Sequence, residues 1–420
     1  METARVTPDL CASIAAGAPA AADRIGFARL TRLAFDGADL RPLWDVLMGR
    51  VAAGTAGAGE GLDLSLIAQL LGDQRTGLAI QAEVLGFHRL FRSPCAGAQP
   101  KLRVLALAAP IDMGGNTPIE FLLEGSDIEL LTLYVLTEAD LARLPEHDVA
   151  IVVASDSDAC AQALRILDRH AAAWPRPLIN PPARVGNLDR DKLYRVLDGI
   201  EGLEIPATVC VNRRELAGAA ESADIRAGRA RDLAFPIVIR PRGSHAGRGL
   251  ARVADGAALR DYLAQQPEED FFVSRFVDYA SADGLYRKYR IVAVDGRPFA
   301  CHMAISDQWN IWYLNAGMAT SESKRREEEA FMRTFDHGFA ARHRGALDAI
   351  IERVGLDYFT LDCAETKGGS LLVFEADNTA VVHNMDLPEL YPYKPAQMRK
   401  VFAAFAAMLH RRARPDRVRS

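Results

Sequence analysis

The feature that most constrains the fold is an alternation of short apolar runs with helix-like stretches, which begins near residue 102. The runs 102–109, 128–136 and 149–155 have the length and composition of buried strands, and the segments between them have helical patterns. Strands that alternate with helices form a parallel sheet covered on both faces. Residues 102–185 are therefore predicted to form a small open α/β domain.

The segment before this domain, residues 1–95, is predicted to be helical behind an alanine-rich, disordered leader. The helical patterns run from about residue 25 to residue 92, and the glycine-rich stretch 51–61 that interrupts them is predicted to be flexible. Helical pairs of this kind resemble tetratricopeptide-type modules, although no repeat of that period is evident. The module is a candidate surface for a protein partner.

Strand-like runs dominate the third region, residues 186–410, which begins and ends with a helical pattern. Its front half contains the apolar runs 235–241, 271–277, 289–296 and 297–305. A helix at 339–354 is followed by two strands, 357–366 and 370–378, which join at the glycine turn 367–369. We predict antiparallel sheets and helices here, an α/β fold class for the chain, and a basic, solvated tail at 411–420.

The composition argues against several classes of protein. Hydrophobic residues make up 49% and charged residues 25% of the chain, which is typical of a soluble globular protein. The net charge of -5 disfavours a general nucleic-acid surface, and no apolar run reaches the ~18 residues of a membrane span. Six cysteines without close pairs, and a start unlike a secretory signal, predict free thiols and a cytoplasmic location.

A glycine-rich loop at residues 242–249 lies between two apolar runs, directly after Arg240 and Pro241. Glycines let backbone amides approach an anion closely, and an arginine at the end of a strand adds a fixed charge. The loop has neither the GxxxxGK[ST] nor the GxGxxG pattern. On the loop alone, a phosphate clamp and a plain hairpin with a polar tip both remain open.

The order of other charged groups along the chain favours the phosphate clamp. Lys192 lies at the head of a helix upstream of Arg240, and the extended segment 273–279 downstream can line a purine with its backbone. Asp362 and Glu375 lie on the two strands of the late hairpin. Carboxylates that face each other across a hairpin can share Mg²⁺, which keeps phosphate oxygens among its ligands. This order predicts a site for a nucleoside triphosphate.

With these motifs the sequence resembles the ATP-grasp superfamily, in particular carboxylate–amine ligases such as D-alanine–D-alanine ligase and the ribosomal-protein glutamate ligases. The resemblance covers about residues 175–410, and the α/β segment before them is similar to the domain that precedes the grasp in that superfamily. The whole chain is most similar to bacterial proteins that join tetratricopeptide-like helices to an ATP-grasp module. The resemblance implies ATP and Mg²⁺ as cofactors, with two metal ions and with Mn²⁺ as a substitute.

The resemblance also implies a set of ATP-binding residues. Lys192 matches the first nucleotide-binding lysine, and Arg240 stands where the ligases usually have the lysine of V-x-K-P. Ser274 replaces the usual glutamate before the adenine linker, which leaves the adenine contacts open. The implied ATP-binding residues are Lys192, Arg240, Arg242, Gly243, Ser244, His245, Gly247, Gly249, Arg275, Phe276 and Val277.

The implied metal ligands are Asp362, Glu375, Asp377 in the slot of the usual asparagine, and Asn378 beside it. Which of Asp377 and Asn378 binds the metal is open. Arg290 matches the basic residue near the transferred phosphoryl group and is the implied catalytic residue. From the residues alone, solvated hairpin carboxylates and a cross-strand ion pair of Arg290 are the alternatives.

The implied activity is ATP-dependent ligation of a carboxylate to an amine through an acyl phosphate, on a peptide or amino-acid substrate. His302, His383 and Asn116 are candidate substrate contacts, although structural histidines and an ordinary helix cap explain them equally well. A small-molecule kinase and a weakly catalytic nucleotide-binding scaffold are the alternative functions. A homodimer is the default assembly, and neither a membrane nor a nucleic acid is an expected partner.

Overall fold

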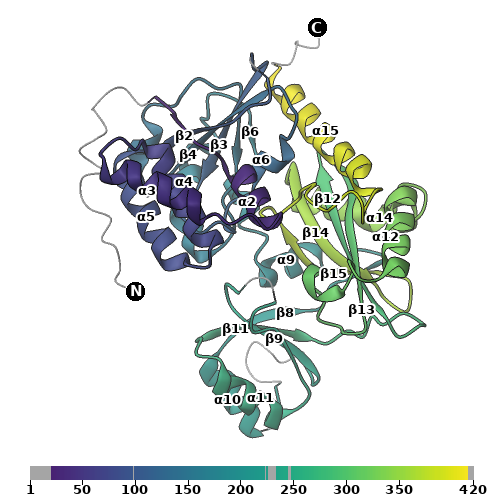
Figure 1. The fold of residues 1–420 in the computed structure, drawn as a ribbon. Helices are drawn as coiled ribbons and strands as arrows, with labels where there is room; N and C mark the ends of the chain where they lie inside the picture. Colours follow the sequence, from purple (N-terminus) through teal and green to yellow (C-terminus); the bar gives the residue numbers. More distant parts are fainter. Residues whose placement is uncertain (1–19, 98, 223, 226–232, 245–246, 415–420) are drawn as a thin grey trace.

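The computed structural model describes residues 20–97, 99–222, 224–225, 233–244 and 247–414. In this part of the chain the strands form three sheets, and helix α15 runs along the boundary between the first and the last of them (Figure 1). The helices and strands are mixed along the chain, so the predicted α/β fold class is confirmed.

The first sheet has six strands in the order β1-β2-β4-β3-β5-β6. Strand β3 pairs in parallel with β4 and β5, as the alternating pattern predicted, and β2 is antiparallel to β4. Its strands are β1 (Ala22–Asp23), β2 (Leu90–Ser93), β3 (Leu102–Ala108), β4 (Ile128–Tyr134), β5 (Val149–Val152) and β6 (Leu178–Ile179). Helices α6 (Ile119–Leu122) and α7 (Ala161–Ala171) connect its strands, and α8 (Pro182–Val185) follows β6.

The N-terminal helices lie against this sheet rather than apart from it (Figure 1). They are α2 (Phe27–Phe35), α3 (Arg41–Ala52), α4 (Ala58–Leu70) and α5 (Gln74–Phe87). Two local predictions are wrong. Residues 58–61, predicted to be flexible, form the first turn of α4, where Glu60 Oε2 accepts a hydrogen bond from the Gly57 amide at 2.9 Å. The end of the helix predicted to reach residue 92 is instead strand β2. Strand β1, which precedes these helices in the chain, and β2, which follows them, extend the α/β sheet at one edge.

The second sheet has four antiparallel strands in the order β10-β9-β11-β8. Apolar side chains of one face, among them Ile239, Phe271 and Val273, are buried against helices α10 and α11. Because side chains alternate along a strand, the other face carries Arg240 and its cross-strand neighbour Phe272. The elements are β8 (Thr208–Asn212), β9 (Ile237–Pro241), β10 (Ala251–Val253), β11 (Asp270–Arg275), α10 (Arg213–Ser222) and α11 (Gly256–Gln265).

The third sheet has five strands in the order β13-β12-β14-β15-β7. One face packs on α12 and α13, where the rings of Tyr289 and Phe331 lie 4.9 Å apart. On the other face, α15 packs on the end near Tyr358, whose ring lies 5.2 Å from that of Phe405. The elements are β7 (Leu203–Glu204), β12 (Tyr286–Val294), β13 (Arg297–Ser306), β14 (Tyr358–Glu365), β15 (Leu371–Asp377), α12 (Glu322–Thr334), α13 (Phe339–Arg342), α14 (Arg344–Val354) and α15 (Lys394–Ala413).

Helix α9 (Arg190–Leu197) lies where the second and third sheets meet, in contact with β8 and β15. Its first residue is fixed by Asp189, whose side chain accepts a hydrogen bond from the Arg190 amide at 3.0 Å. The helix start therefore points its first side chains toward both sheets. Among the described residues no helix has the length and apolarity that a membrane crossing requires, and Cys95, Cys160, Cys210, Cys301 and Cys363 are free.

We predict that Gly59→Ala lowers the free energy of unfolding by about 1–3 kcal/mol, because the new methyl group overpacks a tight contact. A Cβ at this position of α4 would lie 1.9 Å from the carbonyl oxygen of Asp23 in β1. Gly49→Ala in α3 is the matched control, because a Cβ there meets nothing within 4 Å and alanine favours the helix. Chemical denaturation of both variants tests the contact, and equal stabilities would contradict it.

Candidate functional site

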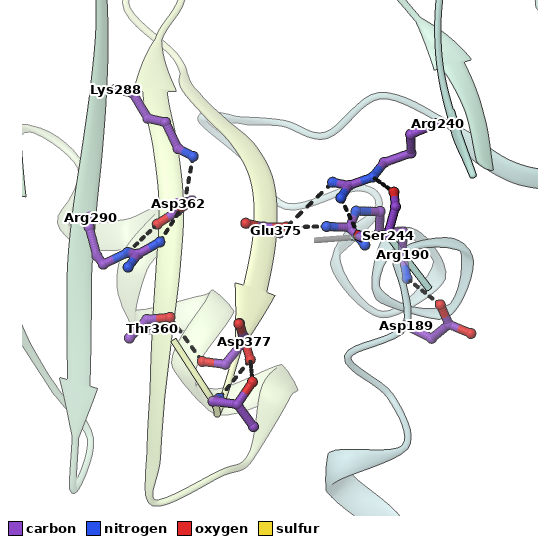
Figure 2. A network of polar contacts seen from close by, with 11 residues as sticks. Asp189, Arg190, Arg240, Ser244, Lys288, Arg290, Thr360, Asp362, Glu375 and Asp377 are labelled. Atoms are coloured by element: carbon purple, nitrogen blue, oxygen red, sulfur yellow. Dashed lines mark hydrogen bonds and ion pairs between the residues drawn. The ribbon is translucent and has the colours of Figure 1, made fainter. Parts of the chain in front are cut away.

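A row of charged side chains crosses the third sheet on the face opposite α12 and α13, in the part that α15 does not cover. In the strand register Arg290 on β12 lies opposite Asp362 on β14, which lies opposite Glu375 on β15. Arg290 donates two hydrogen bonds to Asp362, from Nε to Oδ1 at 2.7 Å and from Nη2 to Oδ2 at 3.0 Å. Lys288, two residues before Arg290 on the same face, places Nζ 2.7 Å from Asp362 Oδ2. Both oxygens of this carboxylate therefore contact cations (Figure 2).

Asp362 is ionised despite its burial. Its side chain is 2% exposed, and burial alone would raise its pKa, but Arg290 and Lys288 outweigh that effect and hold the pKa well below its usual range. The same pairing raises the pKa of Arg290, against the effect of its own burial. The pair is a fixed feature of the site at every physiological pH.

Glu375 connects the second and third sheets. It forms an ion pair with Arg190 at the start of α9, and Arg240 Nη1 on the facing sheet lies 4.0 Å from its Oε2. Figure 2 marks the contacts of Glu375 with these two guanidinium groups. Burial raises the pKa of Glu375, but Arg190, Lys288 and Arg240 together lower it.

Arg240 is held by the loop that follows it. Its Nε donates to Ser244 Oγ at 3.1 Å, and its Nη2 donates to the Ser244 carbonyl oxygen. Burial, followed by the neighbouring charge of Arg190, lowers the pKa of Arg240 to about 10. Two guanidinium groups close to each other make a site that attracts further negative charge.

The glycine loop has the backbone that its sequence suggested. Gly243, Gly247 and Gly249 have φ of 73°, 72° and 66°, a region that residues with side chains rarely adopt. At Gly249 a Cβ would also lie 2.6 Å from Pro241 Cδ. His245, which the resemblance placed in this loop, lies outside the described residues.

Lys192 and Arg242 do not join the row around Glu375. They line a separate cavity of about 310 Å³ between the start of α9 and the edge of the second sheet. Lys192 Nζ donates to the Gly186 carbonyl at 3.1 Å, and Arg242 Nη2 lies 2.9 Å from Asp158 Oδ1. The other lining residues are Asp189, Asp191, Cys210, Asn212, Glu215, Asp270 and Phe272.

Two further carboxylates, Asp377 and Asp156, lie beside the row. Asp377 Oδ1 accepts hydrogen bonds from the Thr379 amide at 2.6 Å and the Thr379 hydroxyl at 2.8 Å, and burial and Glu375 raise the pKa of Asp377. Asp156, in the loop after β5, has its pKa raised to about 7 by burial and by the charges of Asp377 and Asp189. Sequence analysis did not identify Asp156, because its neighbours come from distant segments.

Asn378 points away from Asp377 toward the first sheet. Its Nδ2 donates to the Ala154 carbonyl at 2.9 Å, and its own carbonyl accepts from Thr117 Oγ1 at 2.8 Å. Its Oδ1 is buried and makes no hydrogen bond within the described chain. An uncoordinated buried amide oxygen beside an acidic strand is a suitable ligand for a hard cation.

The carboxylates of the site have the oxygen ligands that Mg²⁺ prefers, but their present arrangement does not suit the ion. Asp362 and Glu375 are neighbours on one face and supply the hard oxygens that Mg²⁺ prefers. In the described ranges, however, no three His, Cys, Asp or Glu side chains gather closely enough to hold a metal ion. Lys288, Arg290 and Arg190 occupy that space instead.

The segment 275–277 connects the second sheet to the third. Arg275 Nη2 lies 2.5 Å from Glu204 Oε1, and the Phe276 amide donates to the Pro236 carbonyl at 3.0 Å. The Phe276 ring lies 5.6 Å from that of Trp309, and Val277 packs in the same small apolar cluster. These residues lie at the hinge of the two sheets, where the resemblance placed adenine.

The three candidate substrate residues have different surroundings. His302 lies opposite Arg290 in the strand register, and burial together with Arg290 and Lys394 holds its pKa well below the ordinary value. The His383 ring lies 5.9 Å from that of Phe35 on α2, and burial lowers its pKa to about 4. Asn116 closes its own loop by exchanging two hydrogen bonds of 2.9 Å with Ala109.

Two members of the site were missed from the sequence, Arg190 and Lys288. Lys288 could have been found, because residues two apart on a strand share a face and Arg290 was already a candidate. Arg190 had no such signal. It lies two residues before the expected Lys192, and residues two apart on a helix face different directions.

No protein-family model matches this sequence, and no curated protein matches it. Among solved structures, the chain is similar to a RimK-domain ATP-grasp protein from Sphaerobacter thermophilus, at 19% identity and a TM-score of 0.44, over 73% of this chain and 99% of that chain. It is also similar to a D-alanine–D-alanine ligase from Bacillus anthracis complexed with ATP, at 11% identity and a TM-score of 0.46, over 74% and 98% of the two chains.

A third similar structure is the ATP-grasp ligase PsnB complexed with the precursor peptide PsnA2 and AMPPNP. It is 11% identical with a TM-score of 0.40, over 74% of this chain and 99% of that chain. At these values, a function for this protein has to rest on its own residues and their geometry.

We predict that Asp156 makes the protein less stable as the pH rises from about 4 to about 7. Its pKa is near 3.9 in an unfolded chain and about 7 here, so the folded state holds the extra proton and loses that advantage as the proton dissociates. Asp156→Asn should reduce the change in the free energy of unfolding over this pH range by roughly 1–3 kcal/mol. Denaturation at several pH values measures it, with the exposed Asp336→Asn as control.

Proposed function

We propose that this protein is an ATP-dependent ligase that joins a carboxylate to an amine through an acyl phosphate. The observation that carries the proposal is the approach of Arg240 on the second sheet to Glu375 on the third, at 4.0 Å, beside Asp362. Cations from three elements and two carboxylates thus face one another next to a glycine-rich loop. This combination suits a triphosphate and its metal ion better than any neutral ligand.

The cations would bind the phosphates of ATP. Arg240 and the amides of the loop after it can hold phosphate oxygens, and Arg190 lies on the same side of Glu375. If a triphosphate draws Arg190 away from Glu375 and Lys288 away from Asp362, the oxygens of these two carboxylates become available to a metal ion. Mg²⁺ held by these carboxylates would neutralise charge on the phosphate oxygens when it is bound.

The side chains of this protein mainly position the reactants and balance charge. An oxygen of the substrate carboxylate attacks the γ-phosphorus, the bond from that phosphorus to the ADP oxygen breaks, and an acyl phosphate forms. The amine then attacks the acyl carbon, phosphate leaves, and the nitrogen loses a proton. Arg290, which Asp362 holds by hydrogen bonds, would stabilise the negative charge that develops on the transferred group.

The substrate class is proposed from the resemblance of the sequence to carboxylate–amine ligases. A peptide or an amino acid is the expected donor or acceptor, and a cytoplasmic location and a homodimer are expected as well. His302, which lies opposite Arg290 in the strand register, is a candidate substrate contact. A protein partner for helices α2–α5 also remains a proposal.

One observation favours a second candidate, a nucleotide-binding scaffold with little catalysis. Both oxygens of Asp362 already contact Arg290 and Lys288, which leaves a metal ion dependent on a rearrangement. Magnesium-dependent release of ADP in the presence of a carboxylate and an amine would exclude the scaffold. A small-molecule kinase would release ADP without an amine, so the amine requirement separates it from the ligase.

We predict that Glu375→Gln lowers the rate of Mg²⁺-dependent ADP release by roughly 10²–10³-fold, as loss of one positioned charge often does. The fold should survive, because glutamine keeps the shape of the side chain and a hydrogen-bond acceptor for Arg190. A coupled assay for ADP and a circular dichroism melt measure the two effects. An unchanged rate of ADP release would show that Glu375 is not a metal ligand.

We predict that Arg190→Gln weakens the affinity for a non-hydrolysable ATP analogue with Mg²⁺ by about tenfold or more, because charge-assisted hydrogen bonds contribute about 1.5–3 kcal/mol. Arg195→Gln on the same helix is the control, since that side chain is 73% exposed and pairs with Asp191. Isothermal titration calorimetry of both variants tests the assignment. Equal affinities in the two variants would show that Arg190 does not touch the nucleotide.

A further inference from the structure

A second cavity, of about 80 Å³, lies between helix α4 and the first sheet. Leu66 on the helix and Ala108, Thr132 and Tyr134 on the sheet line it, and Met113 at its edge is 40% exposed. Ala108 ends strand β3, so the cavity lies at the carboxyl end of a parallel sheet. That is where open α/β sheets usually bind ligands.

Arg24 is the unusual residue of this cavity. Its side chain is 7% exposed, and its Nε donates a long hydrogen bond of 3.4 Å to Asp63 Oδ1. The Tyr134 hydroxyl is a second hydrogen-bond partner of this side chain, and the contact opposes the rise that burial causes in the pKa of Tyr134. A guanidinium has five N–H donors, which is more than its contacts with Asp63 and Tyr134 use. The cavity therefore contains donors that an acceptor group could satisfy.

The guanidinium stays charged in this place. Burial lowers the pKa of Arg24, but the carboxylates of Glu120 and Asp63 raise it by more. Asp63 is fully buried and accepts from the amides of Ile25 at 2.6 Å and Gly26 at 3.4 Å. The cation and its acidic neighbours are therefore fixed in position before any ligand enters.

Glu120 places negative charge on the same cavity. Its Oε1 accepts from Ser93 Oγ at 2.7 Å, and its Oε2 accepts from the Ala28 amide at 2.8 Å. A carboxylate has about four lone-pair sites, so each oxygen can still accept a further hydrogen bond. The cavity thus offers a guanidinium and a carboxylate together, and its remaining wall includes the apolar Leu66 and Ile111.

The size of the cavity limits the ligand. One water needs roughly 10–15 Å³ by this measure, so the cavity holds about five to eight non-hydrogen atoms. An α-amino acid with a short side chain has that size, carries one group of each charge, and ends in a small apolar part. A nucleotide or a peptide is too large.

We propose that this cavity binds a small zwitterionic α-amino acid, with its carboxylate on Arg24 and its ammonium group on Glu120. The short side chain lies against Leu66 and Ile111. The site is separate from the proposed ligase site, and its existence does not depend on that function.

The test is calorimetric titration of the full chain with L-alanine, D-alanine, L-serine and glycine, and with acetate and methylamine as single-charge analogues. At least one amino acid should bind, and both analogues should bind at least tenfold more weakly. If no amino acid binds, or if acetate binds as tightly, the proposal is wrong.

Variants locate the binding. Arg24→Lys keeps the charge beside Asp63 but loses the planar fork, and should weaken amino-acid binding at least tenfold. Ala108→Leu should abolish it by filling the cavity, which keeps the test valid if the first variant folds poorly. Arg29→Lys, on the exposed face of α2, is the matched control. The Glu375→Gln variant should bind the amino acid normally. Loss of binding in this variant, together with normal binding in the Arg24→Lys and Ala108→Leu variants, would show that the ligand occupies the proposed ligase site.

Discussion

The ion pairs of Glu375 with Arg190 and Arg240 are the interaction on which the rest of the site depends. The second and third sheets each bury one apolar face under their own helices and turn a charged face toward each other. Buried charges are costly unless they are paired. A carboxylate of one face meets the guanidinium groups of the other and of α9, so the two faces approach without leaving these charges unpaired.

The same constraint explains why the site is suited to a charged ligand. Asp362 and Glu375 require cations nearby, and the cations are arranged in two groups, Lys288 with Arg290 and Arg190 with Arg240. A triphosphate with a divalent metal ion brings both signs of charge at once. It can therefore replace each internal pair without leaving a buried charge alone, which a neutral ligand cannot do.

The parts of the site that lie on strands were predictable from the sequence. The parts that lie on helices, or that depend on contacts between distant segments, were not. The glycine turn 367–369 and the apolar alternation around Asp362 and Glu375 determine a hairpin, and hairpin pairing brings these two residues together. The start of a helix gives no such register, so Arg190 rather than Lys192 reaches Glu375. The first turn of α4 was missed because its glycines suggested flexibility, whereas Gly59 is required there by the close approach of β1.

The first sheet also helps to position strand β15, which carries Glu375 and Asp377. Asn378 follows β15 directly, and its hydrogen bonds to Ala154 and Thr117 attach the end of that strand to loops of the first sheet. Helix α15 contacts β3 and β5 on one side and β12 and β13 on the other, so the two sheets cannot shift independently. Thr117 also lines the cavity that contains Arg24. Thr117 thus contacts both this cavity and Asn378, the residue that follows the strand carrying Glu375.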